Sequence, residues 1–275
     1  MTEGAYIDAA GVRTHVIALG EGGTPLVMLH GVLSEGASWE GVAPQLATGR
    51  KVVCPDLPLH GRTETPADFD PDPDGLVQWL EALLDDLGAE EADLCGLSLG
   101  GAVALHYSLV RSERVRRMVL VDAANVVDLD EGYRQFISEM REKLEGAIGV
   151  GVTTSRQCWT EEFGFEGART AAVDLCADPI VMSVLDYLEQ RGIPFEQVMH
   201  GLKFLEPIPP ERIAQVQVPT MAIWGSDDPF FPADQAVPVL EAIPGVRIEV
   251  MEGVGHNPAH ERPDRFVRLV EGFLG

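Results

Sequence analysis

The sequence predicts an α/β fold: a mostly parallel, eight-stranded sheet with helices on both faces and an inserted helical segment. Short apolar runs alternate with helical patterns up to Ala123, which is typical of such sheets. This alternation stops between Asn125 and Arg212, and it resumes at Pro219 and continues to residue 275. Because both faces of a parallel sheet are covered, its interior strands are expected to be apolar without polar alternation, as several of these runs are.

Periodicity and turn residues predict the elements of the first 90 or so residues. Residues 6–19 form two β-like runs around Ala10 and Gly11, which predicts an opening hairpin. Residues 57–74 are rich in Pro, Asp and Gly and predict a long surface loop. We expect strands at 25–30 and 51–56, and helices at 38–47, with Trp39 packed inward, and at 76–88.

The central stretch is 92–101, where a buried strand ends at the pattern Gly96-Leu97-Ser98-Leu99-Gly100 and a helix begins. A Cβ two residues before or after the serine would crowd a tight turn, so the glycines allow Ser98 to sit in strained backbone geometry at the end of the strand. The helix, expected over 99–110, would direct its unpaired amides at an oxygen that Ser98 attacks. This pattern predicts a nucleophile elbow.

The second half of the chain predicts a division into two domains. We expect an α/β core made of residues 1–124 and 213–275, and a helical cap (lid) made of residues 125–212, in which helical patterns occur without a buried strand. The core is expected to contain strands at 115–121, 219–225 and 246–251 and helices at 233–242 and 263–274.

Two later loops carry the other residues that a serine nucleophile needs. A serine hydroxyl requires an imidazole to take its proton and a carboxylate to orient that imidazole. His256 lies in a glycine-rich loop after the last expected strand, and Asp227 and Asp228 follow the strand before it. We favour Asp228 as the acid, with Asp227 capping the next turn and Asp122 as a third candidate.

An anionic intermediate would need two backbone donors, which we assign to the amides of Leu99 and Val32. Val32 follows His30 and Gly31 at the end of an apolar strand, and we interpret His30 as a structural support for that loop.

Composition narrows the function classes. The formal net charge of −24 argues against binding nucleic acid or an anionic membrane through a broad basic face. The four cysteines show neither zinc-ligand spacing nor a disulfide framework, and no leader or membrane-spanning run is recognised. We therefore expect a cytoplasmic enzyme, monomeric or homodimeric, with a small-molecule substrate and with neither a metal nor a cofactor.

The chain resembles α/β-hydrolase-fold proteins over nearly its full length. The resemblance is carried by His30-Gly31, by residues 55–62, by the elbow, by Gly225-Ser226-Asp227-Asp228 and by the loop around His256. It implies that the acid is Asp228, the fourth residue of its turn. Leu59 stands where the family usually has glycine. The serine elbow and the cap resemble the branch that contains esterases, enol-lactonases, cofactor-free haloperoxidases and carbon–carbon bond hydrolases.

The sequence favours a serine hydrolase that cleaves a small or medium, fairly apolar carboxylic ester or lactone through an acyl-enzyme at Ser98. Residues 125–212 contain 16 acidic and eight basic side chains, which disfavours coenzyme A or phosphorylated substrates. The alternatives are a carbon–carbon bond hydrolase of a β-diketone-like substrate, a biosynthetic cyclase or lyase, and a non-catalytic ligand-binding receptor.

Overall fold

The computed structural model describes residues 4–127 and 207–275. Within these residues one eight-stranded sheet has the order β1-β2-β4-β3-β5-β6-β7-β8. β1 and β2 pair antiparallel, as do β2 and β4, whereas all other neighbours are parallel. The predicted fold class is thereby confirmed. The strands are β1 (Ala5–Ala9), β2 (Val12–Leu19), β3 (Leu26–Leu29), β4 (Val52–Pro55), β5 (Ala92–Leu97), β6 (Val115–Val121), β7 (Thr220–Gly225) and β8 (Arg247–Met251).

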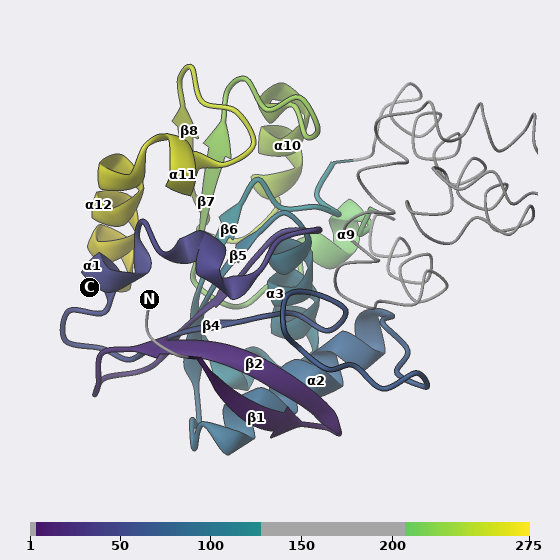
Figure 1. The fold of residues 1–275 in the computed structure, drawn as a ribbon. Coiled ribbons are helices and arrows are strands. Elements are labelled where there is room, and N and C mark those ends of the chain that lie inside the picture. Colours follow the sequence, from purple (N-terminus) through teal and green to yellow (C-terminus); the bar gives the residue numbers. More distant parts are fainter. Residues whose placement is uncertain (1–3, 128–206) are drawn as a thin grey trace, which may run out of the picture. The chain divides into compact units, whose positions relative to one another are not determined.

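Helices cover both faces of the sheet (Figure 1). α1 packs against α12 on one face, and α2 packs against α3 on the other, where α3 also contacts β3, β5 and β6. The described helices are α1 (Ala43–Leu46), α2 (Pro73–Asp86), α3 (Leu99–Val110), α9 (Pro210–Ile213), α10 (Ala233–Leu240), α11 (Pro258–Glu261) and α12 (Pro263–Leu274), with 3₁₀ turns η1 (Gly36–Trp39) and η2 (Ser112–Arg114).

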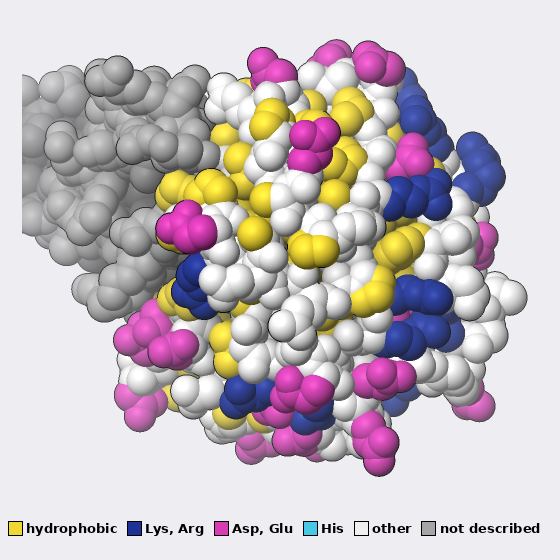
Figure 2. Space-filling view, turned by 180° about the vertical axis from the view of Figure 1, so that it is seen from behind, with side chains coloured by type: hydrophobic (Ala, Val, Ile, Leu, Met, Phe, Trp, Pro, Cys, Tyr) yellow, Lys and Arg dark blue, Asp and Glu magenta, His cyan; other side chains and the backbone are white. Residues whose placement is uncertain are grey.

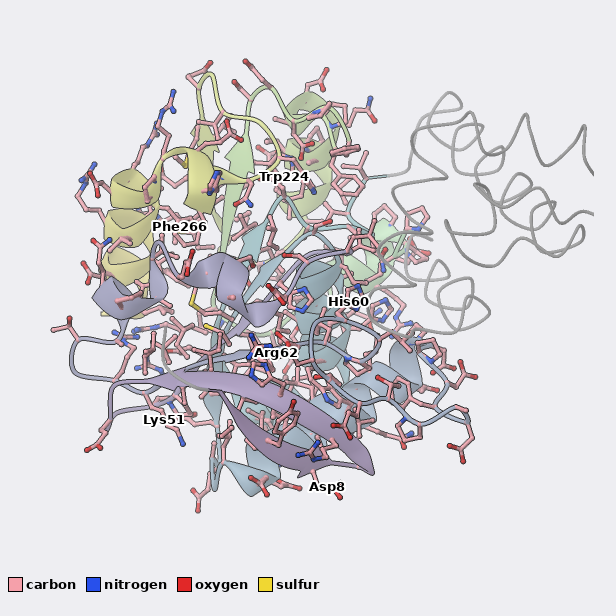
Figure 3. All side chains as sticks on the ribbon, in the orientation of Figure 1. Asp8, Lys51, His60, Arg62, Trp224 and Phe266 are labelled. Atoms are coloured by element: carbon pink, nitrogen blue, oxygen red, sulfur yellow. The ribbon has the colours of Figure 1, made fainter. Side chains whose placement is uncertain are left out.

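The core under α1 and α12 is built from large aromatic side chains and from the apolar strands. Phe266 of α12 stacks on Trp39 with ring centroids 6.1 Å apart, and Figure 3 shows Phe266 on the helix that borders this layer. Cys54 and Cys95 are free thiols buried in the same core. Burial raises the pKa of Cys54 to about 12 and that of Cys95 further, so both thiols are unreactive packing groups.

One expected helix is wrong. Residues 38–47 do not form a continuous helix, because η1 ends at Trp39 and a separate helix, α1, begins at Ala43. Pro44 explains the break, since a proline in the interior of a helix lacks a donor and clashes with the preceding turn, whereas the first turn of a new helix accepts it. Trp39 is buried as expected.

The two described segments that flank residues 128–206 meet at one place. The amide of Ile208 donates to the carbonyl of Asn125 over 2.9 Å, and both side chains are buried. The expected cap boundaries at 125 and 212 remain predictions, because residues 128–206 lie outside the described part of the chain, as do Cys158, Cys176 and His200.

Charged side chains lie mainly at the rim of the face that Figure 2 shows. Asp and Glu occur around its border, while Lys and Arg gather mainly along one edge.

Within the described residues, none of the helices has the length and apolarity needed to cross a bilayer.

Candidate active site

Ser98 lies between β5 and α3 in the strained geometry that the elbow pattern predicts. Its φ of 52° and ψ of −116° are unusual for a residue with a Cβ. The turn is held by its backbone, because the Ser98 amide donates to Val121 and its carbonyl accepts from Ala102 and Ala124. The serine is therefore presented at the carboxyl end of the sheet, where parallel sheets bind ligands.

The glycines around Ser98 are required because other backbone atoms lie too close to leave room for a side chain. A Cβ on Gly96 would lie 2.2 Å from the Gly100 carbonyl oxygen, and one on Gly100 would lie 2.2 Å from the Leu29 carbonyl oxygen. Both distances are shorter than any tolerable contact, so a side chain at Gly96 would push β5 away from the start of α3, and one at Gly100 would push α3 away from the end of β3.

Asp228 is the acid that the structure brings to His256. Its Oδ2 lies 2.8 Å from Nδ1 of His256, and its side chain is fully buried. Its Oδ1 accepts hydrogen bonds from the amides of Phe230 and Phe231. These donors and the imidazole hold the carboxylate in one orientation.

The loop that carries His256 is bound tightly to the loop after β7. A Cβ on Gly225 would lie 2.0 Å from the Gly255 carbonyl oxygen, and the Asp227 amide donates to Val254 over 2.9 Å. The ring of His256 contacts Phe230 and Phe231, with centroid distances of 4.9 and 5.5 Å. The imidazole is thus held between a carboxylate and two aromatic rings.

The expected role of Asp227 as the cap of the next turn is wrong. Its exposed carboxylate accepts from the hydroxyl of Ser226, while the following turn is capped by Asp228 itself. Adjacent side chains in this extended turn point in different directions. Asp228, the buried one of the two, therefore both caps the turn and contacts His256.

Asp122, the third candidate acid, lies directly after β6 and is fully buried. Its Oδ1 accepts from the Gly225 amide over 2.9 Å. One oxygen of Asp122, one of Asp228 and one ring nitrogen of His256 lie within 4.8 Å of one another. Among the described residues these three side chains come close enough to surround a cation, and two of them, Asp228 and His256, make the 2.8 Å contact expected of an acid–base pair.

Ser98 follows β5, so it lies one strand from Asp122, which follows the neighbouring strand β6, while Asp228 and His256 follow β7 and β8 further along the sheet. Within the described part of the chain its hydroxyl makes no hydrogen bond to His256. Such contacts are often long in unliganded enzymes and tighten when substrate binds.

The two amides expected to bind an oxyanion belong to chain segments that lie beside Ser98. Leu99 is the first residue of α3, so its amide has no partner inside the helix. Val32 follows Gly31, where an added Cβ would lie 3.4 Å from the Cβ of Ser98. Neither amide donates a hydrogen bond among the described residues, which leaves both available to a substrate oxygen.

His30 supports the loop that presents Val32. Its Nε2 accepts from the Leu57 amide over 2.9 Å, and its Nδ1 donates to the Gly31 carbonyl over 2.7 Å. Burial, with a contribution from nearby His60, lowers the pKa of His30 to about 3. The imidazole is therefore neutral and acts as a bridge between the loops after β3 and β4.

Asp56 organises the second of these loops. Its buried carboxylate accepts from the amides of Gly36 and Arg62 and pairs with His15 at 2.9 Å. His60 and Arg62 lie on this loop in Figure 3. Leu59 adopts a φ of 68°, which explains why glycine is expected at that position.

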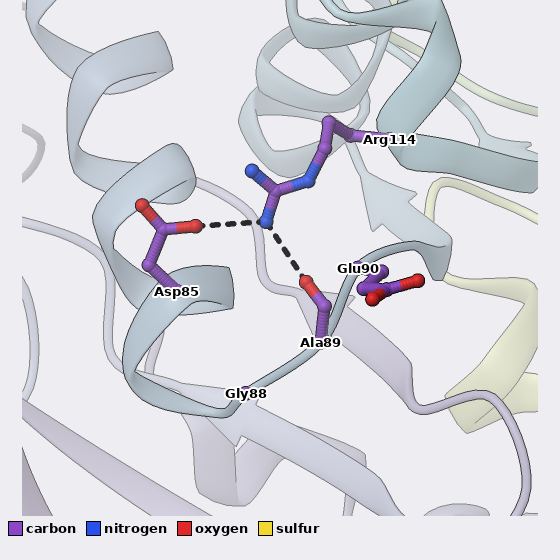
Figure 4. A pocket seen from close by; sticks show the side chains of 5 residues that line it. All are labelled: Asp85, Gly88, Ala89, Glu90 and Arg114. Carbon is purple, nitrogen blue, oxygen red and sulfur yellow. Dashed lines mark hydrogen bonds and ion pairs between the residues drawn. The ribbon is translucent and has the colours of Figure 1, made fainter.

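A separate pocket lies at the amino ends of the strands, between the end of α2 and the start of β5 (Figure 4). Arg114 in this pocket donates to Asp85 and to the carbonyl of Ala89. Its guanidinium thus joins η2 to α2, and the pocket is no part of the candidate site.

Sequence reasoning missed three contributors to the site: Glu261 and the two phenylalanines that contact His256. Glu261 accepts from the amides of Gly255 and Asn257, which flank His256. A carboxylate a few residues beyond a loop histidine is a usable signal, whereas the two aromatic contacts depend on tertiary packing.

Comparisons with known proteins show the family to which the chain belongs. A family model described as "Alpha/beta hydrolase family" matches residues 26–269. The chain is 30% identical to a 2-hydroxymuconate semialdehyde hydrolase from Pseudomonas sp. strain CF600, with 98% of this chain and 93% of the relative covered.

Solved structures give the same result. A meta-cleavage product hydrolase from Pseudomonas fluorescens IP01 superposes with a TM-score of 0.70 at 27% identity, covering 98% of this chain and 97% of that one. A carboxylesterase from Bacillus subtilis superposes with a TM-score of 0.74 at 20% identity, covering 99% and 91%, and shows likeness of fold alone.

Proposed function

Because the chain belongs to the α/β-hydrolase family and is a hydrolase, we propose that it cleaves a small or medium, fairly apolar carboxylic ester or lactone through an acyl-enzyme at Ser98. The observation that carries this proposal is the 2.8 Å contact between buried Asp228 and His256 at the sheet edge where the elbow presents Ser98. No metal or cofactor is part of the proposal.

The chemistry follows from the roles of these groups. His256 takes the Ser98 proton as the oxygen attacks the substrate carbonyl, and Asp228 holds the Nδ1 proton and stabilises the imidazolium. The amides of Leu99 and Val32 stabilise the negative oxygen of the tetrahedral intermediate. His256 then returns the proton to the leaving oxygen, and water attacks the acyl-enzyme by the same route in reverse.

The preference for a neutral substrate rests on charge and on apolar surface. Val32, Leu33 and Phe230 are large apolar residues that remain exposed on loops at the carboxyl ends of the strands. The segment 125–212 carries twice as many acidic as basic residues, 16 against eight, and so disfavours anionic substrates.

The first experiment measures intact mass after treatment with a fluorophosphonate, for the wild type and for Ser98→Ala. We expect one adduct on the wild type and none on the variant, since only an activated serine reacts at a useful rate. A panel of short-chain esters and lactones then defines the substrate class. An absence of adduct on folded wild-type protein would contradict the proposal and favour a ligand-binding receptor or a non-hydrolytic cyclase or lyase.

Carbon–carbon bond hydrolysis is the second candidate, and the named relatives favour it. Hydrolases of 2-hydroxy-6-oxo acids recur among them at 25–27% identity over at least 96% of this chain. The same three residues serve this reaction, but the leaving carbon must be stabilised by a second carbonyl group of the substrate.

One substrate separates the two candidates. We would incubate the protein with 2-hydroxy-6-oxo-2,4-heptadienoate, the compound named for one relative, and identify products by mass spectrometry. Cleavage of this compound at a rate above that of every ester and lactone would replace the first candidate by the second. Ester turnover without carbon–carbon cleavage would retain the first.

A further inference from the structure

Asp122 occupies an unusual position for a carboxyl group. It is the first residue after β6, its φ is 40°, and its side chain is fully buried. The Asp122 amide donates to the Ile223 carbonyl over 3.1 Å, which continues the pairing of β6 with β7 and fixes the backbone. The side chain is therefore held at the carboxyl edge of the sheet, on the strand that lies between β5 and β7.

The two oxygens of Asp122 have different surroundings. Oδ1 accepts from the Gly225 amide, whereas Oδ2 is buried, accepts no hydrogen bond from any described residue, and has the Asp228 carboxyl group as its polar neighbour. No Lys or Arg of the described residues forms an ion pair with Asp122 or with Asp228. An ionised carboxylate with one neutral donor and no cation is strongly disfavoured in such a site.

The ionisable side chains that face Asp122 are the carboxyl groups of Asp228 and Glu261 and the imidazole of His256. Asp228 approaches from the loop after β7, Glu261 from α11, and His256 from the loop after β8. Asp228 already accepts from two amides and from His256, so it is the better site for the negative charge. Burial raises the pKa of Asp122 to about 9, and the charges of Asp228 and Glu261 raise it in the same direction.

We propose that Asp122 is held as a neutral carboxylic acid and is a positioning residue, whose O–H donates toward the Asp228 carboxylate and orients it on Nδ1 of His256. The proton stays on Asp122 throughout the reaction, and only Asp228 carries charge. This inference rests on the proposed function because it assigns Asp122 a part in activating Ser98, but the protonation of Asp122 is testable without turnover.

The decisive variants are Asp122→Asn and Asp122→Ala. An asparagine reproduces a neutral acid closely, since its oxygen accepts from Gly225 and its NH₂ donates toward Asp228. We expect Asp122→Asn to keep the rate of fluorophosphonate labelling. The plot of that rate against pH should also keep its midpoint on the acidic side, called the acidic limb below. Asp122→Ala should label about tenfold more slowly, the effect of losing one charge-assisted hydrogen bond.

An ionised Asp122 gives the opposite result. Removing its charge in Asp122→Asn would lower the affinity of His256 for a proton and move the acidic limb to lower pH. That shift, or a loss of rate in Asp122→Asn equal to that in Asp122→Ala, would overturn the proposal.

A stability measurement tests the protonation state even if no substrate or probe reacts. The carboxyl ionises near 3.8 in the unfolded chain and near 9 in the folded one, so the native state is progressively disfavoured as the pH rises between these values. The folding equilibrium constant of Asp122→Asn, divided by that of the wild type, should rise by up to about tenfold per pH unit in this range. A ratio that stays flat from about pH 5 to pH 8 would refute a neutral Asp122.

Infrared spectroscopy of the wild type provides a check that needs no folded variant. We expect the C=O stretch of a protonated carboxyl group at neutral pH and its disappearance in strongly alkaline buffer. Absence of this band at neutral pH would also refute the proposal. Failure of labelling in wild type and variants alike, with the band present, would contradict the proposed function and leave the neutral Asp122 standing.

Discussion

The amide of Leu57 donates a hydrogen bond to Nε2 of His30, so the loop after β4 is bound to the loop after β3 through one buried ring. This bond requires an unprotonated Nε2, because a protonated ring nitrogen is a donor and would face another donor. The protonation of His30 is therefore incompatible with the loop that presents Gly31 and Val32 to Ser98. His30 should therefore contribute to the loss of stability in acid.

His30→Gln should change the pH dependence of stability. The unfolded chain takes up a proton on His30 near pH 6.5, whereas the folded chain resists until about pH 3. Native stability is thus complete above pH 6.5 and falls as the pH drops, by up to about 1.4 kcal/mol per unit. Urea unfolding at about pH 7.5 and pH 5 should show a larger loss for the wild type than for His30→Gln. Parallel losses in the two proteins would show that His30 is already protonated in the fold.

Asp228→Asn and Asp227→Asn form a matched pair on neighbouring positions. Asp228→Asn should lower kcat by roughly 10⁴-fold, because an amide no longer holds the proton on Nδ1 or stabilises the imidazolium. Asp227→Asn removes the same charge from an exposed side chain whose hydrogen bond among the described residues is to Ser226, and should leave kcat close to that of the wild type. Steady-state kinetics on the best ester substrate would check both, and a large effect at Asp227 would reverse the assignment of the acid.

Most of the fold could be predicted because its signals are local. The elbow helix 99–110 and the strand 115–121 have the predicted bounds, since an apolar run and its flanking glycine or charged residues mark both ends. The prediction of one helix over 38–47 was wrong because Pro44 is compatible with the first turn of a new helix but interrupts the interior of a longer one. The contacts of Asp122 with Gly225 and Asp228 join loops that meet only in the folded chain, so no pattern along the sequence predicts them, whereas the position of Glu261 a few residues beyond His256 is a local signal.

The turn between β1 and β2 offers a stabilising substitution. Ala10 and Gly11 have φ values of 54° and 82°, a two-residue turn in which both positions are left-handed. Asparagine tolerates this conformation better than alanine, so Ala10→Asn should stabilise the fold by roughly 0.5–1 kcal/mol. Gly11→Ala, which introduces a Cβ at the second left-handed position, should destabilise it by about 1–2 kcal/mol. Thermal unfolding measures both, and a Tm for Ala10→Asn below that of the wild type would contradict this view of the turn.

Glu261 links α11 to the loop of His256 and should influence activity without touching substrate. Its carboxylate accepts from Gly255 on one side of His256 and from Asn257 on the other. Because the side chain is exposed, Glu261→Ala should lower the free energy of unfolding by only about 0.5–1.5 kcal/mol. The freed loop should nevertheless lower kcat by roughly tenfold, since small displacements of a catalytic group are costly.

Two further variants separate the role of hydrogen bonding from that of charge. Glu261→Gln retains an oxygen acceptor for the loop amides and should recover most of the activity. Glu252→Ala removes a negative charge from the beginning of the same loop, where the exposed side chain makes no hydrogen bond among the described residues, and should have little effect. If Glu252→Ala and Glu261→Ala lowered kcat equally, the effect would be electrostatic, and Glu261 would have no specific part in holding His256.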